Sequence, residues 1–155
     1  MRIFAIIGIV VVALISLGAG AYLLFQHFGG HYDVESKAYV DRIIPLVCKD
    51  WNEGLVLQES SPELMKFIEK DKEKFDKLFV WFADRLGPLK EYKGSQGEAV
   101  LSYTAKDGKI LTGSYAVQAD FEKGPADIQV RVVLHGDKWQ ILLFKVNSDR
   151  FLAGP

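Results

Sequence analysis

The apolar residues of this chain change their spacing once, near Pro88, from a helical period to the period of a β-strand. Before Pro88 they recur every three or four residues, as on one face of an α-helix, and after it they alternate. Because the period changes only once, the sequence predicts helices first and consecutive antiparallel strands afterwards. This order is typical of an α+β domain whose helices pack on one face of a sheet.

A first amphipathic helix is expected to begin near Asp33, which is a suitable N-cap residue. Its apolar face consists of Val40, Ile43, Ile44, Val47 and Trp51. Pro45 is expected to kink or divide this helix, because proline lacks an amide donor and clashes with the preceding turn. Cys48 lies in the same apolar stretch and is the only cysteine of the chain, so we expect a buried, unreactive thiol.

A second helical region follows. Ser61-Pro62 has the form of an N-cap followed by proline at the first helical position, and Gly87-Pro88 is a stop signal. The apolar residues of segment 62–86 fit one helix or two helices broken near Lys70, of which two are favoured. The sequence therefore predicts two or three helices in all.

After Pro88, turn signals at 106–109, 122–125 and 136–138 separate alternating segments. They predict a curved antiparallel sheet of four strands. Residues 139–146 are apolar on both faces, which is typical of a central or doubly covered strand.

This helix–helix–meander pattern resembles the nuclear-transport-factor-two-like superfamily, whose members have a cystatin-like α+β roll. It is particularly similar to small exported or membrane-anchored bacterial members of unknown function. The segments that carry the resemblance are 60–64, 86–94, 115–124, 126–133, 136–141 and 144–146. The resemblance covers about residues 35–148 and concerns the fold, because this scaffold serves enzymes, binding modules and oligomerisation domains alike.

The resemblance also implies a pocket on the concave face of the sheet, where enzymatic members use an Asp, Tyr or His. The candidate pocket residues are Tyr103, Tyr115, Asp120, His135 and Trp139. None of them lies in a catalytic motif of the superfamily, so no catalytic role is carried over and the catalytic residues are unknown.

The residues themselves suggest simpler roles. Asp120 should face away from the apolar side of its strand, and His135 should be exposed beside a turn. Tyr103 and Tyr115, like Trp139, should be part of the core or of a pocket wall. Trp139 in particular should share a face with Ile141 and Leu143 and pack beside Phe79 or Phe82.

The run from Ile3 to Phe25 contains no charge and would extend about 34 Å as a helix, enough to cross a hydrocarbon core of about 30 Å. We expect residues 1–30 to be a membrane anchor with a hinge, and residues 31–155 to be the roll domain. The alternative is a cleaved signal peptide, because Ala19-Gly20-Ala21 has the form of a signal-peptidase site. The apolar run continues past this triplet, which favours the anchor.

Positive charges on the two sides of the run are nearly balanced, with Arg2 before it and Lys37 and Arg42 after it. A two-residue head fits a signal-anchor whose following domain is exported. The expected location is a bacterial inner membrane, crossed once, with the C-terminal domain outside the cytoplasm.

Composition excludes some partners and cofactors. The net charge is −1, with no basic stripe of the kind that binds nucleic acid. His27 and His31 lack a third ligand at suitable spacing, so neither a metal nor another cofactor is expected. The expected function is a non-enzymatic envelope module that binds a ligand or a protein partner, possibly as a homodimer. The alternative is a small anchored isomerase or hydrolase that uses a pocket Tyr, Asp or His.

Overall fold

In the computed structural model of this protein the described residues are 30–152, and those from Asp33 onward belong to one compact unit. The predicted anchor, residues 3–25, lies outside the described residues, as does the possible cleavage site. Within the described part of the chain, no helix is both long enough and apolar enough to cross a membrane. The anchor and the boundary at residue 30 therefore stay predictions.

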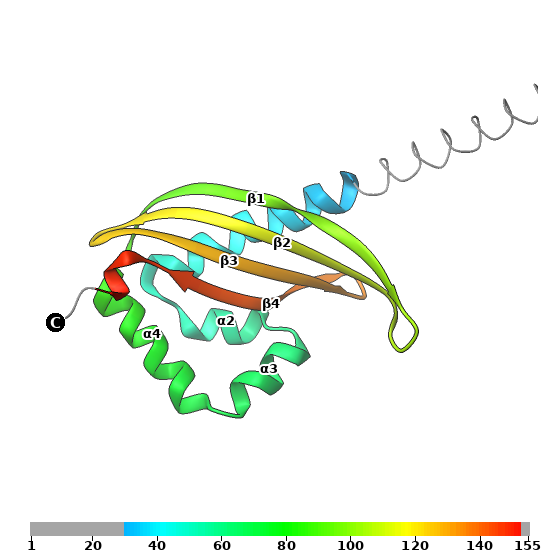
Figure 1. Ribbon diagram of the computed structural model, residues 1–155, viewed down its shortest axis with the longest axis horizontal. Helices are drawn as coiled ribbons and strands as arrows, with labels where there is room; N and C mark the ends of the chain where they lie inside the picture. Colours follow the sequence, from blue (N-terminus) through cyan, green and yellow to red (C-terminus); the bar gives the residue numbers. More distant parts are fainter. Residues whose placement is uncertain (1–29, 153–155) are drawn as a thin grey trace, which may run out of the picture. The chain divides into compact units, whose positions relative to one another are not determined.

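The described chain folds as α-helices followed by a four-stranded antiparallel sheet, which confirms the predicted α+β class (Figure 1). Its helices are a helix over residues 30–50, α2 (Glu53–Glu59), α3 (Pro62–Glu69) and α4 (Lys72–Leu86). The strands are β1 (Leu89–Thr104), β2 (Gly108–Phe121), β3 (Gly124–His135) and β4 (Lys138–Asn147), followed by the 3-10 turn η1 (Asp149–Phe151). The described residues thus contain four α-helices, where the sequence predicted two or three.

The helix of residues 30–50 continues through Pro45, so this proline does not divide it. The helix ends at Trp51, which has a positive φ of 51°. The backbone N–H of Asn52 then donates to the carbonyl of Val47 at 2.8 Å. This bond closes the last turn in the manner of a Schellman motif, with tryptophan at the position that glycine usually occupies.

The additional helix is α2, which begins directly after this turn. The side chain of Asn52 accepts a hydrogen bond from the backbone N–H of Leu55 at 3.0 Å. With seven residues, α2 is too short for its apolar spacing to be recognised. The stretch 62–86 is broken near Lys70 into α3 and α4, as the favoured two-helix interpretation has it, and each helix has its own N-cap, Ser61 and Asp71.

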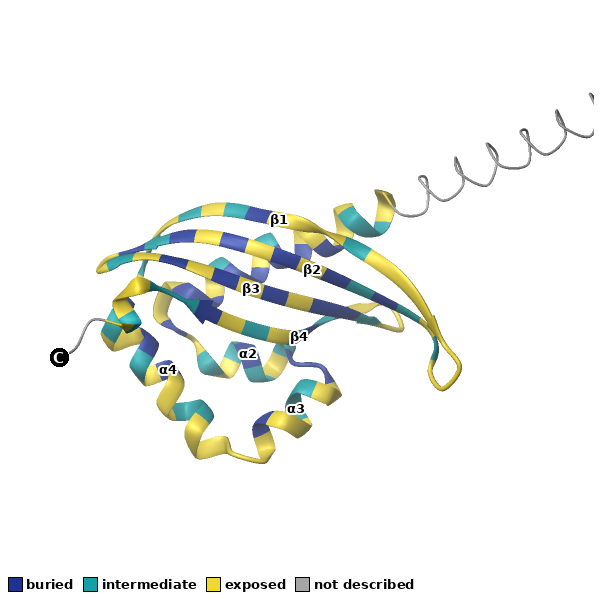
Figure 2. Cartoon of the chain, in the orientation of Figure 1, coloured by how far each residue is buried: buried dark blue, intermediate teal, exposed yellow. Residues whose placement is uncertain are grey.

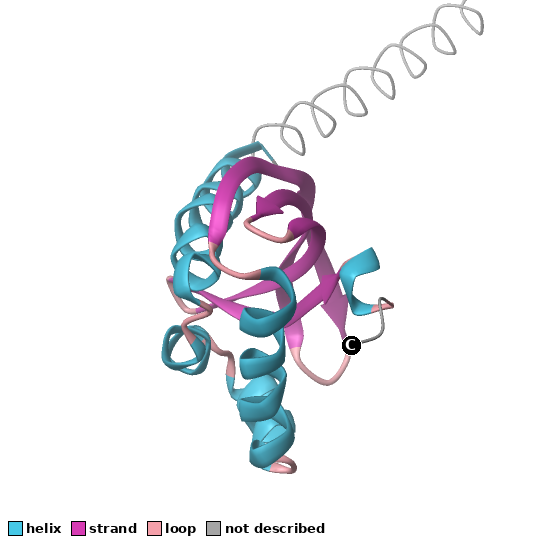
Figure 3. Cartoon of the chain, turned by 90° about the vertical axis from the view of Figure 1, so that its left-hand side faces the viewer, coloured by secondary structure: helices cyan, strands magenta, loops and turns pink. Residues whose placement is uncertain are grey.

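The sheet is a meander with strand order β1-β2-β3-β4, and its hairpin turns lie where the sequence predicted them. Alternate residues of β2 and β3 are buried and the intervening residues are mostly exposed (Figure 2). The helices cover one face of the sheet (Figure 3). The buried apolar residues of these two strands are Leu111, Tyr115, Val117, Ala119, Phe121, Ala126, Ile128, Val130, Val132 and Val133.

Contrary to the sequence prediction, β4 is an edge strand and not a central one. A β-bulge at Leu142 shifts the side chains of β4 by one position, so Ile141 is fully buried and Leu143 is 38% exposed. The edge of β4 is covered in part, because Ser60 forms a bridge with Ile141 and the backbone N–H of Ser61 donates to the Ile141 carbonyl at 2.8 Å. The bulge also corrects the expectation that Leu143 shares a face with Ile141.

Candidate functional site: a charged hollow beside Trp139

A charged hollow of about 650 Å³ lies where the helix of residues 30–50, the end of α2 and the start of β4 meet. We call it the Trp139 hollow, and its lining consists of Glu35, Ala38, Tyr39, Arg42, Glu59, Asp137, Lys138 and Trp139. Its most buried lining side chains are aromatic, Tyr39 and Trp139, and its rim carries acidic and basic groups. The hollow is open to solvent.

Three local features of the chain bring these residues together. Glu35, Tyr39 and Arg42 lie on one face of the first helix because they are three or four residues apart. Glu59 is the last residue of α2, and it is held beside β4 by the bridge between Ser60 and Ile141. Ala38 also comes from the first helix, and Asp137, Lys138 and Trp139 come from the β3–β4 turn and the first residues of β4.

Tyr39 and Glu59 form the best-defined polar contact of the hollow. The Tyr39 hydroxyl donates to Glu59 Oε2 at 2.9 Å, and the Arg42 guanidinium lies 5.8 Å from the centre of the Tyr39 ring. Burial, together with this hydrogen bond to a carboxylate, raises the pKa of Tyr39 well above its ordinary value. The phenol therefore stays protonated and acts as a hydrogen-bond donor, not as a base.

Trp139 is buried, and its indole N–H has no hydrogen-bond partner among the described residues. It does not pack as the sequence suggested. The ring of Phe79 stacks on Phe144, with centroids 6.1 Å apart, and Phe82 contacts Trp51. Phe144 lies five residues further along β4, roughly 16 Å from Trp139 at the rise of a β-strand. Trp139 instead lies at the opposite end of β4, beside the first helix.

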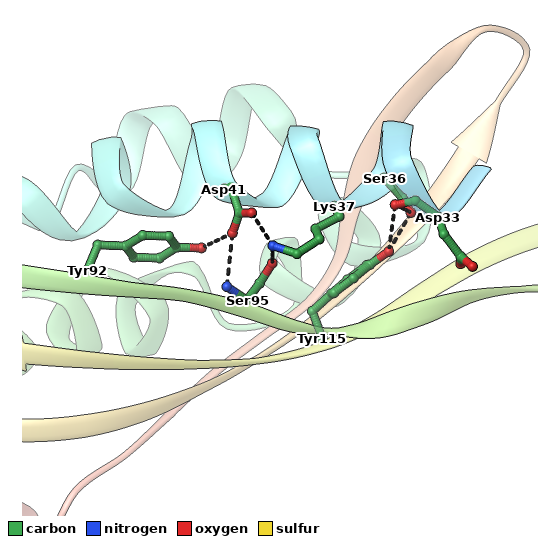
Figure 4. A network of polar contacts seen from close by, with 7 residues as sticks. All are labelled: Asp33, Ser36, Lys37, Asp41, Tyr92, Ser95 and Tyr115. Atoms are coloured by element: carbon green, nitrogen blue, oxygen red, sulfur yellow. Dashed lines mark hydrogen bonds and ion pairs between the residues drawn. The ribbon is translucent and has the colours of Figure 1, made fainter. Parts of the chain in front are cut away.

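Tyr115 is also buried, but it belongs to a different cluster (Figure 4). Its hydroxyl shares a hydrogen bond with the hydroxyl of the fully buried Ser36, and the two oxygens are 2.6 Å apart. Burial raises the pKa of Tyr115. The pair satisfies two polar groups in the core between the first helix and β2, which is a structural role.

The same helix face carries Asp41, which connects the helix to β1 (Figure 4). Asp41 Oδ1 accepts hydrogen bonds from the Tyr92 hydroxyl at 2.6 Å and from the backbone N–H of Ser95 at 3.0 Å, and Lys37 pairs with Oδ2. Partial burial raises the pKa of Asp41, but the hydrogen bonds from Lys37, Tyr92 and Ser95 outweigh it, so its pKa is lowered. Asp41 is therefore an ionised carboxylate that holds β1 beside the helix.

The other three candidates lie apart from the hollow. Tyr103 is 78% exposed near the end of the β1–β2 hairpin, which corrects its expected place in the core or a pocket wall. Asp120 faces away from the buried side of β2, as predicted, and pairs with Lys93 at 2.8 Å. His135 is exposed at the end of β3, as predicted, with Nε2 3.2 Å from Glu63 Oε2. Of the five candidates, only Trp139 lines the hollow.

Sequence reasoning missed Tyr39, Arg42 and Glu59. A signal existed for the first two, because they lie at helical spacing next to the apolar stripe that begins at Val40. No comparable signal pointed to Glu59, because it belongs to the short helix α2.

No group of three or more His, Cys, Asp or Glu residues that could hold a metal ion occurs in the part of the chain that the structure describes. Cys48 is buried, as predicted, and burial raises the pKa of its thiol.

The fold is that of an α+β domain compatible with a roll. No family model matches the chain, and no curated protein or solved structure is significantly similar to it. The site is therefore interpreted from its own geometry.

Proposed function

We propose that this protein is a membrane-anchored, non-enzymatic module of the bacterial envelope that binds a protein partner through the Trp139 hollow. In this proposal residues 3–25 cross the inner membrane once, and the roll domain, of the nuclear-transport-factor-two-like type, lies outside the cytoplasm. The apolar run supports the anchor, because its length matches a hydrocarbon core.

The observation that carries the binding role is the composition of the hollow. Two basic residues, Arg42 and Lys138, and three acidic residues surround an aromatic wall. A protein segment with both charges and an apolar side chain fits such a surface, since rim charges select partners and buried aromatic groups supply contact area. The space between helices and sheet is filled with apolar side chains, so a partner would bind at an open surface such as this hollow.

The test is purification of the full chain from native membranes after chemical cross-linking, with mass spectrometry of the attached proteins. Arg42→Glu and Lys138→Glu reverse charges at the hollow. Arg131→Glu is the matched control, because Arg131 is exposed on the uncovered face of β3. We expect the two hollow variants to lose one cross-linked protein that the control variant retains.

Retention of the same cross-linked proteins by all three variants would contradict binding at the hollow. The thermal midpoint of each variant shows whether a loss reflects unfolding instead.

A homodimer through the sheet is a second part of the proposal. The uncovered face of β2 and β3 carries small and polar side chains, including Ser114, Gln118 and Gln129. Because this face is polar, a dimer there would be held by hydrogen bonds more than by apolar burial. Sedimentation of the full chain in detergent measures its mass, and a monomer at all concentrations would exclude this dimer.

One observation favours the enzymatic alternative, a small anchored isomerase or hydrolase. The Tyr39 hydroxyl and the Glu59 carboxylate meet at the wall of the hollow. Proton abstraction beside a carbonyl group uses a carboxylate as the base and a hydroxyl as a hydrogen-bond donor. Against it, the two groups already satisfy each other and the hollow is open to water. Tyr39→Phe separates the two roles, because it should abolish turnover of an accepted substrate but leave partner binding within about threefold.

A further inference from the structure

The end of the β1–β2 hairpin extends beyond the rest of the sheet (Figure 1). We call residues 100–110 the hairpin tip. Residues 100–104 of β1 pair with residues 108–112 of β2, and β3 begins to pair with β2 only at Thr112. Among the described strands the tip is thus a two-stranded ribbon without a third strand beside it. Such ribbons have little stability of their own in water.

The tip nevertheless exposes apolar side chains. Val100 is 51%, Leu101 42% and Tyr103 78% exposed, and they lie on both faces of the ribbon. Lys106 and Lys109 are exposed beside them. A tyrosine with aliphatic neighbours and nearby lysines is the combination that membrane–water interfaces favour.

The first helix fixes the direction in which the tip points. Asp33 accepts a hydrogen bond from the backbone N–H of Ala99, and Asp41 accepts one from that of Ser95. From Asp33 to Asp41 the helix rises about 12 Å over eight residues, and from Ser95 to Ala99 the strand rises about 13 Å over four residues. The spacing of the two carboxylates therefore matches the spacing of the two N–H groups on the edge strand.

The helix therefore runs in the direction opposite to β1. Beyond Ala99, β1 continues toward the side from which the chain enters the helix at Asp33. From Ala99 to Thr104 the hairpin extends roughly 17 Å in that direction.

The predicted anchor ends close to this point along the chain. Only seven residues separate Phe25 from Asp33, and eight peptide steps span at most about 28 Å. The membrane surface would thus lie within about 28 Å of Asp33. The tip extends roughly 17 Å beyond Ala99, whose backbone N–H is bonded to Asp33.

We propose that the hairpin tip docks on the surface of the bilayer that holds the anchor. Leu101 and Tyr103 enter the headgroup region, and Lys106 and Lys109 lie near anionic headgroups. This contact gives the tethered domain a fixed orientation on the bilayer. The docking depends on the membrane anchor proposed above.

The test uses the full chain reconstituted into vesicles of phosphatidylethanolamine with phosphatidylglycerol as the anionic lipid. Tyr103→Cys places an environment-sensitive dye on the tip. Glu91→Cys is the matched control, because Glu91 is an exposed residue of the same strand pair at the other end of the sheet. Cys48 is buried with a raised thiol pKa, so it remains unlabelled.

We expect a quencher carried by the lipid to act on the dye at position 103 at least about twice as strongly as at position 91. Equal quenching at the two positions overturns the docking. The docking is also overturned if the Tyr103→Cys variant without dye cross-links to a second copy of the chain and the same variant with dye escapes the lipid quencher. The tip then pairs with another protein edge.

Alkaline carbonate extraction of the same vesicles separates this result from the anchor itself. Protein that stays in the membrane with an unquenched tip contradicts the docking alone. Protein that is extracted contradicts the anchor and the docking together. Equal thermal midpoints of the two cysteine variants show that the fold is intact.

Discussion

The indole N–H of Trp51 donates a hydrogen bond to the backbone carbonyl of Gly87 at 2.7 Å, which ties the end of the first helix to the end of α4. The Trp51 ring also stacks on Phe121 of β2, with centroids 5.0 Å apart and planes at 20°. Trp51 has a positive φ, which is unfavourable for a large residue. The buried indole offsets this strain by joining two helices and the sheet.

Replacing Trp51 with alanine should therefore lower the free energy of unfolding by about 3–5 kcal/mol, as truncation of a buried aromatic residue does. Urea unfolding of the full chain in detergent measures this loss. Trp81→Ala is the matched control, because Trp81 is only partly buried and stacks on Phe151 of the C-terminal 3-10 turn. A cost for Trp51→Ala no greater than that of the control would contradict the anchoring role.

Asp41 predicts an acid-sensitive contribution to stability. The folded-state pKa of Asp41 is lowered from an ordinary value of 3.8 by its hydrogen bonds, despite partial burial. The contribution is therefore complete above pH 3.8 and is lost as the pH falls through the lower folded pKa. Asp41→Asn should be less stable than the parent at pH 7, and the difference should shrink below about pH 4.

Thermal midpoints measured from pH 7 to strongly acidic buffer check this prediction. Asp127→Asn is the control, because Asp127 is an exposed residue of β3 and its replacement should change the midpoint little at any pH. A difference between Asp41→Asn and the parent that stays constant down to the most acidic pH would show that the carboxylate charge is not involved.

Gly97 lies where β1 and β2 approach each other too closely for a side chain. A Cβ atom at this position would be 1.9 Å from the Ser114 carbonyl oxygen and 2.9 Å from Tyr115 Cα, and these backbone atoms cannot move aside locally. Gly97→Ala should therefore destabilise the protein by at least about 1–3 kcal/mol.

Gly54→Ala is the matched substitution with the opposite expected sign. Gly54 lies in α2, and a Cβ there meets only Asn52 Oδ1 at an ordinary 3.4 Å. Alanine should stabilise this helix by about 0.5–1 kcal/mol. Unfolding experiments on both variants test the pair, and a stabilising Gly97→Ala would refute the close approach.

These positions also show how far the sequence could predict the fold. The α+β order and the three hairpin turns followed from the single change of period, because each turn has glycine and polar residues between alternating segments. The start of β1 follows Pro88, but its alternation is weak, since Gly94, Gly97 and polar residues interrupt it and its pairing with β2 shifts register. The edge position of β4 was missed because the bulge at Leu142 makes both faces of the strand look apolar.

The candidate site was less predictable than the fold. The Trp139 hollow combines the first helix, the end of α2 and the β3–β4 turn, and these segments meet only through tertiary packing. Trp139 was found because tryptophan is conspicuous after a turn. Tyr39 and Glu59 are 20 residues apart in the sequence, and their hydrogen bond depends on a helix that has no periodic signal.

Trp139 provides the last prediction, because its ring is buried while its indole N–H has no partner among the described residues. Truncation in Trp139→Ala should cost about 3–5 kcal/mol and lower the thermal midpoint strongly. Trp139→Phe should cost clearly less, because it keeps most of the ring and removes an unpaired donor whose burial is unfavourable by about 1–3 kcal/mol. Thermal unfolding of both variants in the full chain gives the order of stability. If Trp139→Ala melts like the parent and only partner binding is lost, the indole serves the hollow alone and its structural role is refuted.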